Sequence, residues 1–478
     1  MGNSPPITSI HILDDDSLLN VFRLYRPFLL GEDQNEADRL TGGDGRWARG
    51  RWWYKLAHVC QRWRILVLGS ASYLDVSLVC TNGTHVADML AHSPPFPLVI
   101  DYDVGHSDIT AEDEEEAILA LKQRDRVRRV RLATPTTILQ KLIAVMDDEY
   151  PILEYLIVLN SLEDKSKIST FPETFQAPHL RHLLLRGFAF PIGSRLLTTA
   201  VGLATLCLII GHPSIYFYPN TLLQWLSFMP QLESLLIEFS FPVPNRDVER
   251  QLTHTPITTP ITLPSLHVLQ FQGVGTYMEA LVHRMTTPRL EKLEIIFFNQ
   301  LTFSAPRLMQ SVSVAENFRF KSAKFGFFDE RVSVEVYADE EAEILALSVA
   351  INCGHLDWQV SSMAQISSSL SQAFSAVEHL TLEHSAHSRS SEEHNEADLS
   401  GWHKLLGSFR NVKTLSIDDG LVEKLSRCLQ PDGGELPSEM LPELQELTYS
   451  RSGDIGDAFT SFVDARQNAG RPITVIRS

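Results

Sequence analysis

Apolar residues recur along most of this chain in the pattern apolar-x-x-apolar-x-apolar. Successive copies begin at Val127, Leu153, Leu180, Leu203, Leu232, Leu266, Leu290, Val377, Val412 and Leu444. The apolar and polar positions alternate at the end of each copy, which predicts a strand with one buried face. Before many copies, apolar residues lie three and four apart, as in residues 222–229, and this spacing predicts a helix. The chain therefore reads as repeated helix–strand units.

A proline stands just before many of these strands and marks the end of the preceding helix. The prolines are Pro178, Pro230, Pro264, Pro288 and Pro442. A repeated order of helix and strand predicts parallel strands with helices on one face. Neither the helix nor the strand can bury its apolar side alone, so neighbouring units must stack. We therefore expect an α/β fold with a solenoid over residues 111–478, preceded by a connecting segment over residues 69–110. The copies resemble leucine-rich repeats of irregular length.

The helix–strand rhythm changes between the copies at Leu290 and Val377. Residues 325–328, 332–337 and 344–351 alternate without a good helix between them, and Asp329-Glu330 makes a plausible turn. This pattern favours strands joined by hairpins. We expect a β-hairpin-rich interruption of the solenoid over residues 312–355.

The polar positions between the strand leucines are the candidates for binding, because the leucines themselves belong to the core. On the strand face opposite the core these positions include Arg129, Arg131, Tyr155, His182, Lys292, Glu294, His379 and Thr381. Solenoids of this kind bind partners on their concave face. These residues are the predicted substrate-binding set.

Residues 7–68 differ from the rest of the chain and predict a small all-helical module. Leu18, Leu19 and Phe22 fit an amphipathic helix that follows an acidic start, and acids suit a helix N-terminus. Residues 26–50 are polar and glycine-rich, which is typical of an insertion. Residues 52–64 form a second amphipathic stretch, with Trp53 and Trp63 at helical spacing.

The motifs of this module resemble an F-box. The segment from Ile12 through Phe22 is similar to its first helix, and Val59-Cys60-Gln61-Arg62-Trp63-Arg64 matches its ending, Val-Cys-x-x-Trp-Arg. The larger frame looks like fungal F-box proteins with leucine-rich repeats, including residues 74–80 and 356–365. The resemblance covers nearly the whole chain.

The resemblance implies a substrate receptor of a cullin–RING ubiquitin ligase, which docks on a Skp-type adaptor and presents an unknown protein target. The adaptor-binding positions carried over by the resemblance are Ile12, Leu13, Leu18, Leu19, Phe22, Val59, Cys60, Trp63 and Arg64. A scaffold protein remains the alternative, in which the N-terminal helices only cap the solenoid and bind no adaptor. Exposure of these apolar side chains distinguishes the two, because a cap buries them.

Composition excludes several other classes. The net charge of −18 argues against a nucleic-acid partner, which needs a positive surface. The longest apolar runs are about half of the roughly 20 residues needed to cross a bilayer, and the N-terminus has no secretory signal. The five cysteines form no disulfide or zinc spacing, so we expect a cytoplasmic or nuclear protein.

No catalytic motif is recognisable, so we expect a protein that is not an enzyme and that needs no cofactor. The chain lacks a phosphate-binding glycine loop, a His-Glu-x-x-His sequence and a Gly-x-Ser-x-Gly sequence. Four histidines gather at His379, His384, His387 and His394, but they lack the fixed spacing of metal ligands. We therefore predict no metal site.

Overall fold

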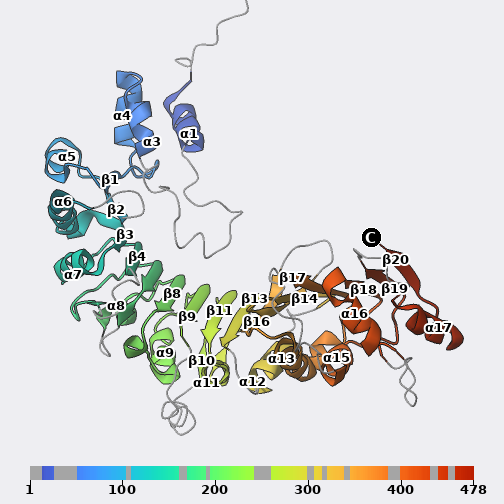
Figure 1. Cartoon of the computed structure of the whole chain (residues 1–478). Helices are drawn as coiled ribbons and strands as arrows, with labels where there is room; N and C mark the ends of the chain where they lie inside the picture. The colour runs from blue at the N-terminus through green and yellow to red at the C-terminus, as the bar shows by residue number, and fades with distance from the viewer. Residues whose placement is uncertain are drawn as a thin grey trace, which may run out of the picture. The chain divides into compact units, whose positions relative to one another are not determined.

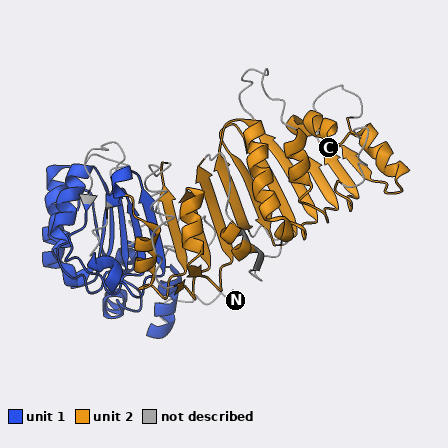
Figure 2. Cartoon of the chain, turned by 90° about the horizontal axis from the view of Figure 1, so that it is seen from below, with its two compact units in different colours: residues 1–215 blue, residues 216–478 orange. Residues whose placement is uncertain are grey.

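The structure is a computed structural model, and it describes residues 13–25, 51–103, 109–160, 169–189, 194–241, 260–298, 306–314, 320–338, 345–385, 399–430, 440–449 and 458–477. The chain divides into two compact units, Met1–Ile215 and Tyr216–Ser478 (Figure 2). Both are mixed α/β units built on a mostly parallel sheet, as the helix–strand pattern predicts.

The first unit begins with three helices: α1 (Asp15–Tyr25), α3 (Trp52–Ala57) and α4 (Gln61–Gly69). Asp14 starts α1 by accepting a hydrogen bond from the backbone N–H of Ser17 at 2.7 Å. The second amphipathic stretch is two helices, because Cys60 is extended, with φ −159° and ψ 171°. Trp53 of α3 then donates to the carbonyl of Ser77, just before the first strand, whereas Trp63 of α4 faces α1.

The sheet of the first unit is parallel throughout, with its strands in chain order. The strands are β1 (Leu78–Thr81), β2 (Leu98–Asp103), β3 (Val127–Thr134), β4 (Tyr155–Asn160), β6 (His182–Arg186) and β8 (Thr205–Ile210). The helices between them are α5 (Val86–His92), α6 (Ala111–Leu121), α7 (Thr136–Val145) and α8 (Arg195–Thr199), with 3-10 turns η3 (Arg124–Arg126) and η4 (Pro213–Ile215). A separate small ladder pairs β5 (Ser169–Thr170) with β7 (Phe188–Ala189). The stretch expected as a connecting segment thus supplies β1, α5 and β2.

Polar side chains of α6 fix the start of this sheet. Thr110 and Asp113 form a capping box at the N-terminus of α6. The carboxylate of Asp113 also accepts the backbone N–H of Gly83 at 2.6 Å, and Glu116 accepts that of Val86 at 2.8 Å. One helix therefore satisfies donors of the turn and of the helix that precede it, which ties consecutive repeats together.

The second unit has a longer sheet, in the spatial order β9, β11, β13, β16, β15, β14, β17, β18, β19 and β20. The bounds are β9 (Ser234–Phe239), β11 (Val268–Gly273), β13 (Lys292–Phe298), β14 (Ser322–Phe328), β15 (Val332–Tyr337), β16 (Leu345–Asn352), β17 (His379–Ser385), β18 (Thr414–Ile417), β19 (Glu446–Tyr449) and β20 (Thr474–Arg477). A two-stranded ladder joins β10 (Ile261–Thr262) to β12 (Met285–Thr286).

Helices cover one face of the second unit's sheet (Figures 1 and 2). They are α9 (Pro219–Leu226), α11 (Gly275–Val282), α12 (Pro306–Val314), α13 (Leu356–Ser369), α14 (Ser371–Phe374), α15 (Leu399–Leu406), α16 (Asp419–Cys428) and α17 (Thr460–Asn468). The parallel order is broken where hairpins are expected, because β15 pairs antiparallel with both β14 and β16. The chain then resumes parallel pairing through β14 and β17.

The repeated leucines form the core of both units. Leu156, Leu183 and Leu206 lie in register on neighbouring strands, and each is fully buried. Leu380, Leu415 and Leu447 repeat the arrangement in the second unit. Full burial of one leucine side chain contributes about 1.5–3 kcal/mol, so the packing of these leucines contributes much of the driving force for the fold.

Candidate protein-binding surfaces

The two halves of the N-terminal helical module meet through an aromatic contact. Phe22 of α1 and Trp63 of α4 pack edge to face, with ring centroids 4.7 Å apart. Leu18 and Phe22 are fully buried, whereas Leu19 and Trp63 are half-buried. Leu18 and Phe22, which belong to the predicted adaptor-binding set, are therefore the core of the module and offer no surface to a partner.

Polar contacts hold α1 in place at its start and at its middle. At the start, Arg62 donates to the carbonyl of Leu13 at 2.7 Å and pairs with Asp15 at 2.6 Å. At the middle of the helix, the Tyr73 hydroxyl donates to the amide oxygen of Asn20 at 2.9 Å. Arg62 and Tyr73 were not among the predicted site residues, because contacts between segments this far apart leave no periodic signal.

Exposed apolar side chains concentrate on this module. Seven of the fourteen large apolar side chains that are exposed in the described part of the chain lie between residues 13 and 73. They are Leu13, Val21, Leu24, Tyr25, Val59, Ile65 and Tyr73. Leu24 is 84% exposed, Ile65 63% and Val59 58%. We refer to these seven residues as the apolar surface of the module.

The remaining predicted adaptor residues fall at the helix break. Cys60 is half-buried, and Arg64 is exposed, with its Nε donating to the carbonyl of Ala57 at 3.0 Å. Arg64 thus bridges the break between α3 and α4. Ile12 lies outside the described residues. Of the predicted set, Leu13 and Val59 are the members that belong to the apolar surface.

Helix α3 covers the edge of the sheet. Trp52 and Trp53 are buried, and the indole N–H of Trp53 donates to the carbonyl of Ser77 at 2.9 Å. Arg51 donates to the carbonyl of Val79 in β1 at 3.4 Å. These side chains satisfy one backbone carbonyl just before the edge strand and one within it, which is how a terminal cap protects a sheet.

A row of polar side chains crosses the first unit's sheet on the face opposite the core. Arg129, Tyr155, His182 and Thr205 are consecutive partners in the strand register. The guanidinium of Arg129 lies 4.7 Å from the Tyr155 ring centroid, and Tyr155 stacks on His182 at 4.3 Å. The ring of His182 contacts the Thr205 hydroxyl at 3.1 Å. The structure therefore brings together three of the predicted residues as one stack.

The protonation of His182 follows from this setting. Burial, and then the positive charges of Arg129 and Arg181, lower its pKa from 6.5 to about 4. His182 is therefore neutral at physiological pH, and its ring accepts or donates a single proton towards Thr205 according to its tautomer.

Arg131 occupies the next row of the same face and is enclosed. It lies only 6% exposed and pairs with Asp101 at 3.1 Å and Asp103 at 2.7 Å. Burial raises the pKa of Asp101, and the Arg131 charge opposes that rise. Arg131 was predicted to contact a substrate, but in the structure its guanidinium pairs with two aspartates of the protein itself. Strand alternation identified its face and could not show that this position is enclosed.

The two units differ in how open this strand face is. In the first unit Ile157, Leu184 and Cys207 are neighbours in register beside Arg131, and all three are buried. In the second unit buried and half-buried residues alternate strictly along β11 and β13, so the face opposite the core is accessible at these two strands. Of the predicted substrate-binding residues, Arg131 is the buried one, and the others are half-buried in both units.

The accessible face of the second unit carries charged and hydrogen-bonding side chains. Glu294 pairs with Lys292 at 2.7 Å and accepts from Gln270 at 2.8 Å. His379 contacts the Thr414 hydroxyl at 2.8 Å, which repeats the His182–Thr205 contact of the first unit. Thr381 is half-buried beside Lys324, its partner in register.

An ion pair between Lys324 and Glu383, 2.9 Å long, extends this face beyond the predicted residues. Lys324 was missed because it lies on β14, inside the hairpin segment, where the repeat pattern is absent. The face as a whole offers both charges and hydrogen-bonding groups, which suits recognition of a protein surface.

Two other features are absent from the described residues. No group of three or more histidine, cysteine, aspartate or glutamate side chains in those ranges could hold a metal ion, and His387 and His394 lie outside them. Within the same ranges, no helix has the length and apolar character needed to span a bilayer. Comparison of the chain with models of protein families and with curated proteins found no match.

Proposed function

We propose that this chain is a protein-interaction subunit that uses its helical module to dock on a Skp-type adaptor. Through that adaptor it recruits a target protein to a cullin–RING ubiquitin ligase in the cytoplasm or nucleus. The observation that carries the proposal is the apolar surface of the module, including Leu24, Val59 and Ile65, which stays exposed while Leu18 and Phe22 form a core beneath it. Exposed apolar side chains gathered on one small module mark an interaction site.

The alternative is a scaffold whose N-terminal helices only cap the repeats. Capping is already performed by α3, whose Trp53 and neighbouring Arg51 bond to carbonyls at the sheet edge. Helices α1 and α4 are not required for that purpose, and a purely capping role gives no reason for Leu24 or Ile65 to face solvent. Because α3 makes the capping contacts, the exposed side chains of α1 and α4 favour a substrate receptor over a scaffold.

The rest of the chain acts in this proposal as an irregular leucine-rich-repeat solenoid that holds the target. The strand face of the second unit at Lys292, Glu294, His379 and Thr381 is the better candidate for target binding, because in the first unit Arg131 and its neighbours in register, Ile157 and Leu184, are buried. The chain itself performs no chemistry. It raises the rate of ubiquitin transfer by holding the target close to the ligase.

Co-purification with a Skp-type adaptor tests the proposal. The test variant is Leu24→Ala with Ile65→Ala, which removes two exposed side chains and leaves the Phe22–Trp63 core intact. The matched control is Phe228→Ala with Trp358→Ala, which removes two exposed apolar side chains from the second unit. We expect the adaptor to bind the unaltered chain and the control, and to be lost from the test variant.

Circular dichroism of each variant establishes that it is folded. If the unaltered, folded chain retains no adaptor, the scaffold is the better account. If the adaptor binds the test variant and the unaltered chain equally, the apolar surface of the module is not the docking site.

A further inference from the structure

The strand face of the second unit, which is the face of its sheet opposite the helices, carries an excess of negative charge. Alternation along its ten strands directs five glutamates and two lysines to this face. They are Glu238, Glu294, Glu335, Glu383 and Glu446, with Lys292 and Lys324. All seven side chains are half-buried, so their stems pack on the sheet while their charged ends reach solvent. Five negative charges against two positive ones leave a net charge of −3, which favours a cationic partner.

Glu335 and Glu383 share one cation on this face. Lys324 lies opposite Glu335 in the register of β14 and β15, and it pairs with Glu383 of β17 at 2.9 Å. Among the described residues no cation is bonded to Glu335, whose carboxylate accepts the Tyr337 hydroxyl at 2.8 Å. Lys324 and Glu383 are each 41% exposed, so the cation of a partner can join them. One lysine between two carboxylates leaves a local deficit of positive charge.

An exposed aromatic ring lies beside these charges. Phe328, the last residue of β14, is 40% exposed, and among the exposed large apolar side chains of the described residues it is the aromatic one that belongs to a strand. Its ring covers Gly326, where a Cβ atom would come within 2.6 Å of a ring carbon. Gly326 is the register partner of Glu383, and neighbouring strands are about 4.8 Å apart. The ring of Phe328 therefore lies next to the Lys324–Glu383 pair.

The backbone of Phe328 is fixed although its ring is exposed. Its N–H donates to the carbonyl of Arg331 at 2.8 Å, which closes the turn between β14 and β15. Its carbonyl accepts from Nε2 of Gln359 at 2.7 Å, and the same nitrogen donates to the carbonyl of Cys353 at 2.8 Å. Gln359 is buried in α13, so the helix layer holds the turn in place. A partner that binds this ring therefore loses little free energy in ordering it.

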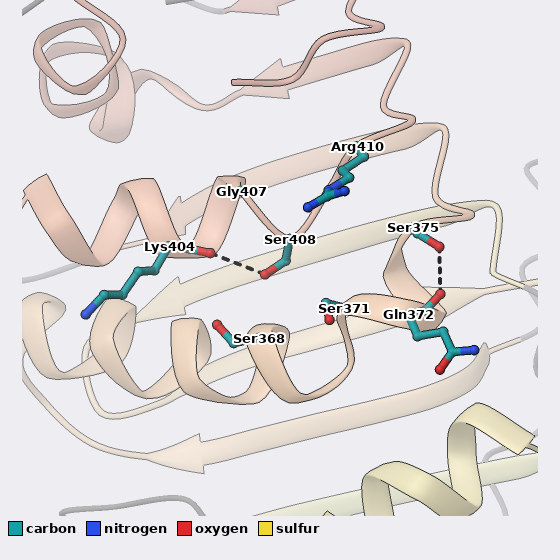
Figure 3. A pocket seen from close by; sticks show the side chains of 8 residues that line it. All are labelled: Ser368, Ser371, Gln372, Ser375, Lys404, Gly407, Ser408 and Arg410. Carbon is teal, nitrogen blue, oxygen red and sulfur yellow. Dashed lines mark hydrogen bonds between the residues drawn. The ribbon is translucent and has the colours of Figure 1, made fainter. Parts of the chain in front are cut away.

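The helices of the same unit carry the opposite charge at one place. A cavity of about 600 Å³ opens where α13, α14 and α15 end, and its lining includes Lys404 and Arg410 but no carboxylate (Figure 3). In that view the ammonium of Lys404 points away from Arg410. A basic partner gains nothing at this cavity, whereas the strand face attracts it.

We propose that the strand face of the second unit binds a basic segment of the target protein, whose arginine side chains stack on Phe328 and pair with Glu383 and Glu335. A guanidinium is planar, so it stacks on an aromatic ring and also forms two parallel bonds with a carboxylate. A lysine ammonium is a point charge and matches this combination less well. The proposal rests on the target-binding role proposed for this face and is independent of adaptor docking.

Unspecific attraction of polycations is the competing explanation, since the whole chain has a net charge of −18. That attraction predicts equal affinity for arginine and lysine peptides. It also predicts that reversing two exposed negative charges anywhere on the chain weakens binding to the same extent. The two explanations therefore separate on the preference for arginine and on the position of the charges.

The test is a fluorescence-anisotropy titration of labelled nona-arginine and nona-lysine with the full chain at physiological ionic strength. We expect nona-arginine to bind at least about threefold more tightly than nona-lysine. Phe328→Leu keeps an apolar side chain and removes the aromatic face, so it should abolish this preference and leave the affinity for nona-lysine unchanged.

Charge reversal tests the two glutamates. Glu335→Lys with Glu383→Lys should weaken the binding of both peptides by about tenfold or more. The charge-matched control is Glu115→Lys with Glu173→Lys, which reverses two exposed glutamates of the first unit and should change the affinity by less than about twofold. Circular dichroism establishes that each variant is folded.

Equal affinity of the unaltered chain for the two peptides would overturn the proposal, as would an arginine preference that survives in Phe328→Leu. Equal weakening by the two charge-reversal variants would assign the binding to the net charge of the chain instead. Each variant should still co-purify with a Skp-type adaptor as the unaltered chain does. Failure of this proposal is therefore distinguishable from failure of adaptor docking, which the peptide titration does not involve.

Discussion

The indole of Trp63 lies edge-on against the ring of Phe22, 4.7 Å between centroids, across a separation of 41 residues in the sequence. This contact joins α1 to α4 and closes the helical module around Leu18. It also determines which side of α1 is left for a partner, because Val21, Leu24 and Tyr25 then face solvent.

Substituting Phe22→Ala should destabilise the helical module by about 3–5 kcal/mol, since it removes a fully buried ring and leaves a cavity. Leu24→Ala, two residues along the same helix, should change stability by less than about 0.5 kcal/mol because Leu24 is exposed. Urea denaturation monitored by tryptophan fluorescence gives both values. Comparable losses in the two variants would contradict the packing described for α1.

Removing Arg131 should destabilise the first unit, because it breaks a buried ion pair. Arg131→Ala leaves the buried Asp101 without its cation, and breaking a buried pair costs about 3–5 kcal/mol. Arg124→Ala is the matched control, because Arg124 pairs with Asp147 and Asp148 near the surface and such pairs contribute about 0–1 kcal/mol. Chemical denaturation of both variants checks the difference. An Arg131→Ala variant as stable as the control would show that its site is accessible to water.

His182 should make the first unit less stable in mild acid. Its pKa is lowered in the folded state to about 4, so its stabilising contribution is complete above pH 6.5 and is lost as the pH falls from 6.5 towards 4. Over that window the unfolded chain takes up a proton that the folded chain resists. The loss amounts to roughly 3 kcal/mol for the full shift.

The measurement is the denaturation midpoint at pH 7 and at about pH 5, compared between the unaltered chain and His182→Gln. The variant should lose less stability on acidification than the unaltered chain. His379→Gln removes the same kind of histidine–threonine contact from the second unit and serves as the control. An unchanged pH dependence in His182→Gln would show that His182 titrates normally in the fold.

Arg466 should be essential to the C-terminal repeat. It is 1% exposed and donates to the carbonyls of Leu441, Pro442 and Leu444 at 3.1, 3.3 and 3.0 Å. Arg466→Ala leaves these acceptors unpaired, at a cost of about 1–3 kcal/mol for each one that water cannot reach. Hydrogen exchange should show faster exchange in β19 and β20 in this variant. The exposed Arg427→Ala is the control and should leave both strands protected.

The sequence by itself determined the repeat, the alternation of helix and strand, the parallel α/β class and the leucines of the core, including Leu156 and Leu380. These features are local, because periodicity and helix-ending prolines depend only on neighbouring residues. It also identified the N-terminal helices and the apolar residues from which Leu18, Phe22 and Trp63 come.

Only the tertiary structure decided which of those residues are accessible. Helix α1 is apolar on more than one side, so periodicity could not tell that Phe22 meets Trp63 while Leu24 faces solvent. Alternation placed Arg131 and Lys292 on equivalent strand faces, but one is enclosed beside Asp101 and the other is half-exposed. Accessibility depends on what packs against a residue from distant parts of the chain, and a local pattern carries no record of those neighbours.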